Sequence, residues 1–135
     1  MALLYLLWYN LLIDYYLMIK LRLHQQEALD VMQLQSKGQI IVPTGGGKTM
    51  CMIEDAKKQF TKNSVSKTIV VVAPRILLAQ QLCEDFLELI DDVDVLHVHS
   101  GETHHTSTTK TKEIEEWYHN SIKNQLIFTT YHSLH

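Results

Sequence analysis

The residue types best suited to chemistry lie in one loop of this 135-residue chain, "PTGGGKT" at positions 43–49. Glycines allow backbone N–H groups to converge on phosphate oxygens in conformations that other residues disfavour. An apolar run precedes the loop and a helical pattern follows it, so a helix N-terminus would add unsatisfied donors. Lys48 would contact the β- and γ-phosphates, and the Thr49 hydroxyl would ligate Mg²⁺. We therefore expect a nucleotide's phosphates to be held by Thr44, Gly45, Gly46, Gly47, Lys48 and Thr49.

A glycine-rich turn at the end of a strand is the structural alternative for this loop. The strand–turn–helix context and the Gly-Lys-Thr sequence favour the phosphate site. The spacing departs from the literal motif at one position, where a glycine is replaced by Val42. The loop alone does not distinguish a kinase from a motor protein.

Apolar runs alternate with helical patterns along the rest of the chain. The runs that predict strands lie at 39–43, 67–74, 93–99 and 124–131. Apolar residues at helical spacing predict helices over 21–34, 47–60 and 75–90, and a short one around 114–122. The segment 100–112 is polar and predicts a loop. This alternation indicates an α/β domain, in which helices cover both faces of a parallel sheet and the crossovers are right-handed.

The amino-terminal segment 1–19 is apolar or aromatic except at Asn10 and Asp14, and Lys20 and Arg22 follow it. As a helix it would be about 28 Å long, close to the thickness of a bilayer core. Asp14 would cost about 2.5–3.5 kcal/mol inside a membrane. We therefore prefer a hydrophobic helix that packs on the domain, with a membrane anchor as the alternative.

The composition is that of a globular protein, with 46% hydrophobic and 20% charged residues. The formal net charge of −3 gives no bulk attraction for nucleic acid, although local contacts to its backbone are not excluded. Cys51 and Cys83 lie far apart in helical patterns and indicate reduced thiols rather than a disulfide. We expect a cytoplasmic location, with the nucleus or a viral or host compartment as alternatives.

Four stretches together resemble superfamily 2 helicases and translocases, in particular the branch that contains type III restriction subunits and related DEAD/DEAH-type helicases. The resemblance extends over 21–134, and its four stretches occur in the family's order. They are "LRLHQQEAL" at 21–29, "PTGGGKT" at 43–49, "VVVAPRILLAQQL" at 70–82 and "LIFTTYHSL" at 126–134. The resemblance implies a RecA-like P-loop domain that binds ATP and Mg²⁺.

The first stretch is similar to the family's adenine-binding segment. Gln25 stands where a glutamine amide both donates to and accepts from adenine. Arg22 is a weaker candidate for adenine or phosphate, and His24 occupies a position where the family often has an aromatic residue. An ordinary amphipathic helix is the alternative for this stretch.

The third and fourth stretches are similar to the motifs that contact a nucleic-acid strand. Backbone N–H groups at the start of the helix that follows residue 74 could bind phosphates. The resemblance places five residues at the nucleic acid: Arg75, Gln81, Gly101, Thr129 and Thr130. A plain strand–helix unit is the alternative for the third stretch.

Two other clusters of polar residues have competing interpretations. The histidine-rich "HVHSGETHH" at 97–105 could suggest a metal site, but no cysteine is near, and a solvated loop beside a strand edge is preferred. Asp91, Asp92 and Asp94 resemble an acidic metal motif. They precede the fourth stretch, whereas the family's acidic pair follows it, so we expect a helix-to-strand loop.

The family's acidic Mg²⁺-binding strand and its second RecA-like domain are not found in the sequence. We therefore expect residues 20–135 to be an incomplete helicase ATP-binding domain that cannot hydrolyse ATP efficiently alone. In the complete protein, ATP hydrolysis would be coupled to movement on DNA, with RNA as the alternative. A different class of function is a non-catalytic nucleotide-binding or interaction module, held at a membrane by residues 1–19.

Overall fold

The computed structural model describes residues 23–39, 41, 47–62, 65–101, 103 and 105–134. The chain divides into two compact units, Met1–Cys51 and Met52–His135. The hydrophobic segment 1–19 and Arg22 lie outside the described residues. Within the described ranges, no helix is both long and apolar enough to cross a membrane.

The described part of the first unit consists of helix α2 (Leu23–Leu34) and the first turn of α3 (Lys48–Thr61). α2 buries Gln25 and Leu29, which lie four positions apart and therefore share one face of the helix. Both helices occur where apolar spacing predicts them. The predicted strand at 39–43 lies mostly outside the described residues, and its described positions, Gln39 and Ile41, belong to no strand.

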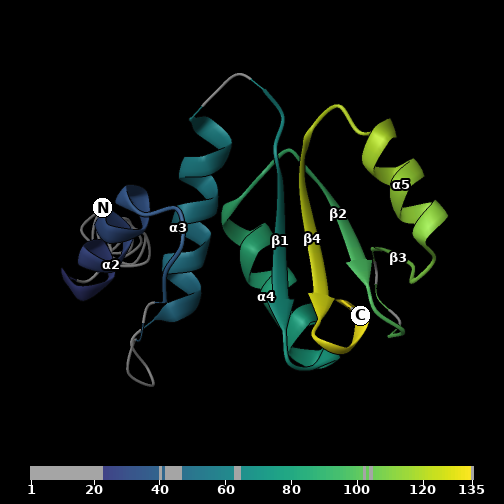
Figure 1. The fold of residues 1–135 in the computed structure, drawn as a ribbon, viewed down its shortest axis with the longest axis horizontal. Helices are drawn as coiled ribbons and strands as arrows, with labels where there is room; N and C mark the ends of the chain where they lie inside the picture. Colours follow the sequence, from purple (N-terminus) through teal and green to yellow (C-terminus); the bar gives the residue numbers. More distant parts are fainter. Residues whose placement is uncertain are drawn as a thin grey trace, which may run out of the picture. The chain divides into compact units, whose positions relative to one another are not determined.

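The second unit contains a four-stranded sheet of β1 (Thr68–Ala73), β2 (Val93–Val98), β3 (Thr106–Ser107) and β4 (Asn124–Thr130). The strand order is β1-β4-β2-β3, and every pair is parallel (Figure 1). Parallel neighbours require long connections, and these carry α4 (Ile76–Leu89) and α5 (Thr111–Asn120). A short 3₁₀ helix, η1 (His132–Leu134), follows β4. The sequence predicts a loop over 100–112, but Thr106 and Ser107 within it form the strand β3 because they pair with β2.

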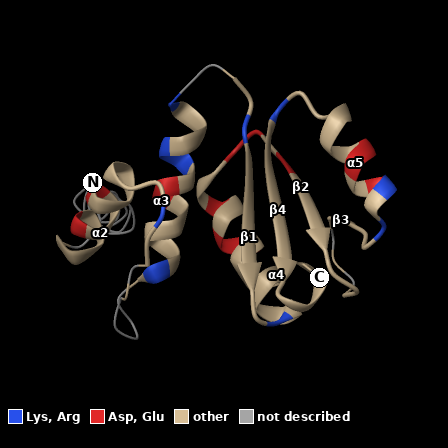
Figure 2. Ribbon diagram, viewed as in Figure 1, with Lys and Arg blue, Asp and Glu red and all other residues tan. Residues whose placement is uncertain are grey.

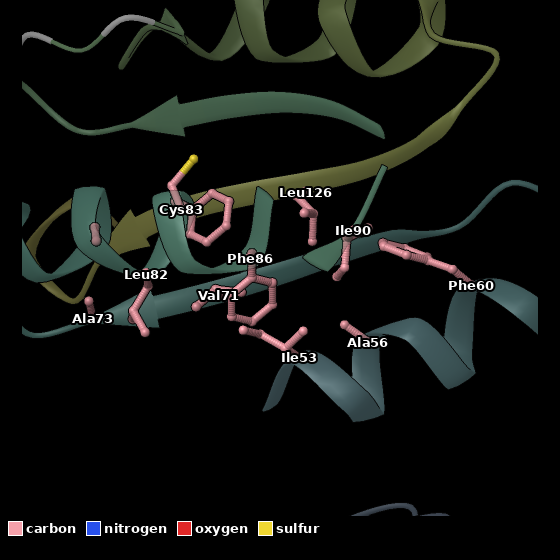
Figure 3. Packing of buried hydrophobic residues seen from close by; sticks show 12 residues of the cluster. Ile53, Ala56, Phe60, Val71, Ala73, Leu82, Cys83, Phe86, Ile90 and Leu126 are labelled. Carbon is pink, nitrogen blue, oxygen red and sulfur yellow. The ribbon is translucent and has the colours of Figure 1, made fainter. Parts of the chain in front are cut away.

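One face of the sheet carries the hydrophobic core (Figure 3). Alternate residues of a strand point to opposite faces, so Val71 and Ala73 of β1 share this face with Leu126 and Phe128 of β4. The rings of Phe86 and Phe128 meet edge to face, with centroids 5.6 Å apart. The remaining core side chains are Ile53, Ala56 and Phe60 of α3, Ala79, Leu82, Cys83 and Phe86 of α4, and Ile90, which follows α4.

Helix α5 is attached to the opposite face of the sheet. The Gln125 side-chain amide donates to the backbone carbonyl of Tyr118 over 3.0 Å, and the Ser121 hydroxyl bonds to the Asp94 carboxylate. Gln125 and Asp94 alternate with the core residues of their strands, so their side chains leave the sheet on the side away from the core. The helices thus flank the sheet on both sides, as the sequence predicts.

Truncation of the aromatic pair tests this core. Phe86→Ala should lower the free energy of unfolding by about 3–5 kcal/mol, because it leaves a cavity between α4 and the sheet. Leu77→Ala on the same helix is the matched control, since Leu77 is 80% exposed. Chemical denaturation followed by circular dichroism measures both variants. Equal midpoints for the two would contradict the packing described.

Candidate functional site

The end of the predicted phosphate loop coincides with the start of α3. Gly47, Lys48 and Thr49 are described, whereas Val42–Gly46 lie outside the described residues. Gly47 has φ 77°, a left-handed conformation that favours glycine. Lys48 and Thr49 are the first two residues of α3, where backbone N–H groups have no partner within the helix. This arrangement fits an anion at the N-terminus of α3.

Gln25 is joined to this loop by a hydrogen bond. Its side-chain amide nitrogen donates to the backbone carbonyl of Gly47 over 3.1 Å, and its side chain is nearly buried. The Cys51 thiol in turn donates to the backbone carbonyl of Gln25 at 3.9 Å. The residue expected to bind adenine therefore also holds the residue that precedes Lys48. Sequence reasoning placed both residues in the nucleotide site but did not predict the bond between them.

The side chain of Gln25 leaves no room for a larger residue at Gly47. A Cβ atom at this position would collide with the Gln25 amide group. The positive φ of Gly47 favours glycine, and a side chain at this position would in addition displace the end of the Gln25 side chain from its bond to the Gly47 carbonyl.

The carboxyl ends of the parallel strands bring the predicted nucleic-acid residues to one edge of the sheet. Ala73 at the end of β1 is in register with Thr130 at the end of β4, and the Tyr131 amide donates to the Ala73 carbonyl over 3.2 Å. Arg75 follows β1, is exposed, and stands immediately before α4. The side chain of Arg75, the N-cap residue, makes no capping hydrogen bond, and the first backbone donors of a helix have no partner within the helix.

Gly101 lies beside the same end of α4. A Cβ atom on Gly101 would approach Ile76 Cγ2, in the first residue of α4, to 2.5 Å. Its backbone nitrogen donates to Nδ1 of His99 over 3.1 Å. A small residue is therefore needed here for packing, whatever its relation to a ligand. Gln81 is exposed and lies further along α4.

Thr129 and Thr130 reach the expected edge of the sheet, but both side chains are buried. The Thr129 hydroxyl donates to the Val98 carbonyl over 2.8 Å. The Thr130 hydroxyl lies 3.2 Å from the Ser133 hydroxyl and accepts a bond from the Ser133 amide. Their contact with phosphate stays a prediction, and it would require these hydroxyls to leave their present partners.

The histidine-rich segment differs from the solvated loop that the sequence suggests. His97 and His99 are fully buried. His97 lies in β2 in register with the core residue Phe128, and His99 follows the end of that strand. Among the described residues, no group of three or more His, Cys, Asp or Glu side chains could hold a metal ion. His104 lies outside the described residues.

The acidic stretch lies at the other end of the sheet. Asp91 and Asp92 connect α4 to β2, as predicted, and Asp92 pairs with Lys123 at 3.1 Å. Asp94 belongs to β2 itself and bonds to Ser121. These carboxylates are thus at the amino ends of the strands, away from Arg75 and Gly101.

Basic residues do not gather into one patch within the second unit. Figure 2 shows Lys and Arg scattered over its helices and strand ends. Contact with nucleic acid would therefore depend on a few local groups, as the net charge of −3 suggests.

Substitution of Gly47 tests the contact with Gln25. Gly47→Ala should destabilise the protein by at least about 1–2 kcal/mol, because alanine is strained at positive φ and its methyl group displaces Gln25. Gly38→Ala is the matched control, since nothing lies within 4 Å of a Cβ atom placed there. Thermal unfolding compares the two variants. A melting temperature as high for Gly47→Ala as for Gly38→Ala would refute the described geometry.

Comparison with known proteins identifies a matching family and a similar fold. The family model of the type III restriction enzyme res subunit matches residues 18–135. A solved structure of a nuclease-deletion mutant of the Type ISP restriction-modification enzyme LlaGI, in complex with a DNA substrate mimic, superposes with a TM-score of 0.71. That match has 22% sequence identity and covers 85% of this chain and 13% of that chain. No curated protein sequence matches.

The match to the family model extends over nearly the whole chain, and the parallel α/β sheet agrees with a RecA-like fold. The chain therefore belongs to the family of the type III restriction enzyme res subunit, within the superfamily 2 helicases.

Proposed function

We propose that this chain is the ATP-binding portion of an ATP-dependent DNA helicase or translocase. The observation that carries the proposal is the hydrogen bond from Gln25 to Gly47. It joins the predicted adenine-binding residue to the start of α3, where the phosphates would lie. The family match supports a helicase-type ATPase module. The DNA substrate mimic bound by the similar restriction enzyme favours DNA over RNA as the partner.

Each residue of the nucleotide site has a distinct role in this proposal. Gln25 binds adenine, with Arg22 as a weaker second contact. Backbone donors of the loop Thr44–Thr49 and the N-terminus of α3 hold the phosphate oxygens. Lys48 would stabilise charge on the γ-phosphate, and the Thr49 hydroxyl would be a ligand of Mg²⁺ bound with ATP. When bound, Mg²⁺ would supply charge neutralisation for the phosphates.

A nucleic-acid strand would lie along the carboxyl edge of the sheet. Arg75 and the backbone N–H groups at the N-terminus of α4 would contact a phosphate of this nucleic-acid strand. The small size of Gly101 would let the nucleic acid approach the sheet edge. Gln81, Thr129 and Thr130 complete the proposed surface. These contacts are to the nucleic-acid backbone, so the surface would bind strands of any sequence.

Turnover requires more than the residues that bind ATP. In phosphoryl transfer the attacking water must be oriented and the transition-state charge neutralised. In the family an acidic pair and a second RecA-like domain supply these functions. We propose that this chain binds ATP and that efficient hydrolysis requires those parts.

Removal of the Lys48 ammonium tests the nucleotide site. Lys48→Ala should weaken ATP–Mg²⁺ binding by at least about tenfold, because it deletes a charge-assisted bond to phosphate. Lys58→Ala, at the exposed opposite end of α3, is the matched control. Isothermal titration of the purified chain measures both affinities, and ATPase assays of a longer protein that contains the chain measure turnover. Unchanged binding and turnover in Lys48→Ala would overturn the assignment.

Removal of the Arg75 charge tests the nucleic-acid surface. Arg75→Ala should weaken binding of single-stranded DNA and reduce the slope of log K against log salt by about 0.7, the value for one lost phosphate contact. Lys123→Ala removes the same charge from the opposite end of the sheet, where Lys123 pairs with Asp92. Fluorescence anisotropy at several salt concentrations gives both slopes. Equal slopes for the two variants would exclude a specific role for Arg75.

A further inference from the structure

The proposed function does not use two buried histidines at the end of β2. His97 is 0% and His99 is 1% exposed, and Nδ1 of His97 lies 3.0 Å from Nε2 of His99. The ring of His97 also stacks on the ring of Phe128, at a centroid distance of 5.6 Å, and on that of His105, at 5.7 Å. Buried histidines in direct contact need an arrangement of protons that satisfies both rings.

The hydrogen bonds determine which nitrogens carry protons. The Gly101 backbone N–H donates to Nδ1 of His99, so this nitrogen must hold a lone pair. A neutral His99 then carries its proton on Nε2 and donates it to Nδ1 of His97. His97 is left with its proton on Nε2, and this buried atom has no hydrogen-bond partner among the residues that the structure describes. The chain of bonds therefore runs in one direction, from Gly101 through His99 to His97.

The first residue of this chain of bonds, Gly101, lies beside the N-terminus of α4. Gly101 packs against Ile76, in the first residue of that helix. The Ser107 hydroxyl donates to the backbone carbonyls of His99, at 3.4 Å, and of Gly101, at 3.3 Å. The backbone at Gly101 is thus held both by an imidazole ring and by the hydroxyl of the paired strand β3.

We propose that His97 and His99 form a proton-sensitive latch that holds the backbone of Gly101 against α4 only while both rings are neutral. A proton added to Nδ1 of His99 removes the acceptor of the Gly101 amide. A proton added to Nδ1 of His97 removes the acceptor of the His99 ring. The first event breaks the bond from the Gly101 amide directly. The second breaks the bond that holds the His99 ring in the orientation that accepts from Gly101, so the Gly101 amide is released indirectly. The latch acts whether or not the chain binds a nucleotide or a nucleic acid.

The surroundings of the two rings oppose the addition of a proton. Burial, together with smaller contributions from the charges of His99 and His105, lowers the pKa of His97 from 6.5 to about 4. Burial also lowers the pKa of His99. The Cys83 thiol of α4, which lies in the core on this face of the sheet, stays neutral, because burial and the nearby charge of Glu84 raise its pKa to about 11.

These pKa shifts determine the direction of the pH dependence. The unfolded chain takes up protons on these histidines as the pH falls through 6.5, whereas the folded His97 does so only near 4. The unfolded state then binds more protons, so folding stability falls as the pH decreases between these values. The latch should open locally at the lower end of this range.

Nuclear magnetic resonance of the ¹⁵N-labelled chain tests the latch directly. Long-range correlation spectra at pH 7.5 should show both rings neutral, with a proton on Nε2 of each. The hydrogen-exchange protection of the Gly101 amide, corrected for the intrinsic rate, should fall by about tenfold between pH 7.5 and 4 as its bond is lost. The amides of Leu126 and Phe128 in β4 should stay protected.

Two variants separate the latch from a general effect of acid. His99→Phe keeps an aromatic ring but removes the acceptor, so Gly101 should exchange fast already at pH 7.5 and show no further pH response. His119→Gln, which removes an exposed histidine of α5, should behave as the wild type. A cationic ring at pH 7.5, an unchanged Gly101 amide at pH 4, or equal loss of protection at Gly101 and in β4 would each overturn the proposal. The titration of the wild type decides the matter even if His99→Phe does not fold.

Discussion

The parallel pairing of β4 with β1 on one side and β2 on the other is the constraint on which the second unit depends. β4 joins strands that are distant in the sequence, since Thr68 pairs with Gln125 and Val93 with Asn124. This register places Phe128 against Phe86 of α4 and so forms the centre of the core. It also brings the carboxyl ends of the three strands to one edge. The core and the candidate nucleic-acid surface therefore both follow from the pairing of β4 with β1 and β2.

The same register explains why some polar groups at that edge are not available to a ligand. Thr129 lies beside Val98 and gives its hydroxyl to the Val98 carbonyl. Thr130 uses its hydroxyl to hold the turn into η1. Buried polar atoms must find partners within the protein, and these two do. The groups that remain directed outward are Arg75 and the uncapped backbone donors of α4.

In the first unit, the main contact that the structure describes joins residues closer together in the sequence. The bond from Gln25 to Gly47 connects α2 with the N-terminus of α3. In the proposed nucleotide site, this bond couples the position of adenine to the conformation of the residue before Lys48. An amide that binds both a ligand and a backbone carbonyl can transmit the presence of one to the other, because a change at either end alters its hydrogen bonds.

Several features of this protein follow from its sequence by itself. Apolar spacing predicts the described helices and the three longer strands, because helical and extended periods place side chains on one face at different intervals. The four motifs in their order predict the family, whereas the Gly-Lys-Thr loop at a helix start by itself predicts only a phosphate site. The need for glycine at 47 is likewise local, since it comes in part from the backbone angle.

Only the tertiary structure decided which polar side chains are buried and what they bond. The sequence predicts a strand over 93–99 at the edge of a solvated loop, but only the pairing of β2 with β4 and β3 shows that His97 and His99 are buried. The two-residue strand β3, the bond from Thr129 to Val98, and the contact of Gly101 with Ile76 have the same origin. Each depends on residues brought together from distant positions, and local periodicity carries no information about such partners.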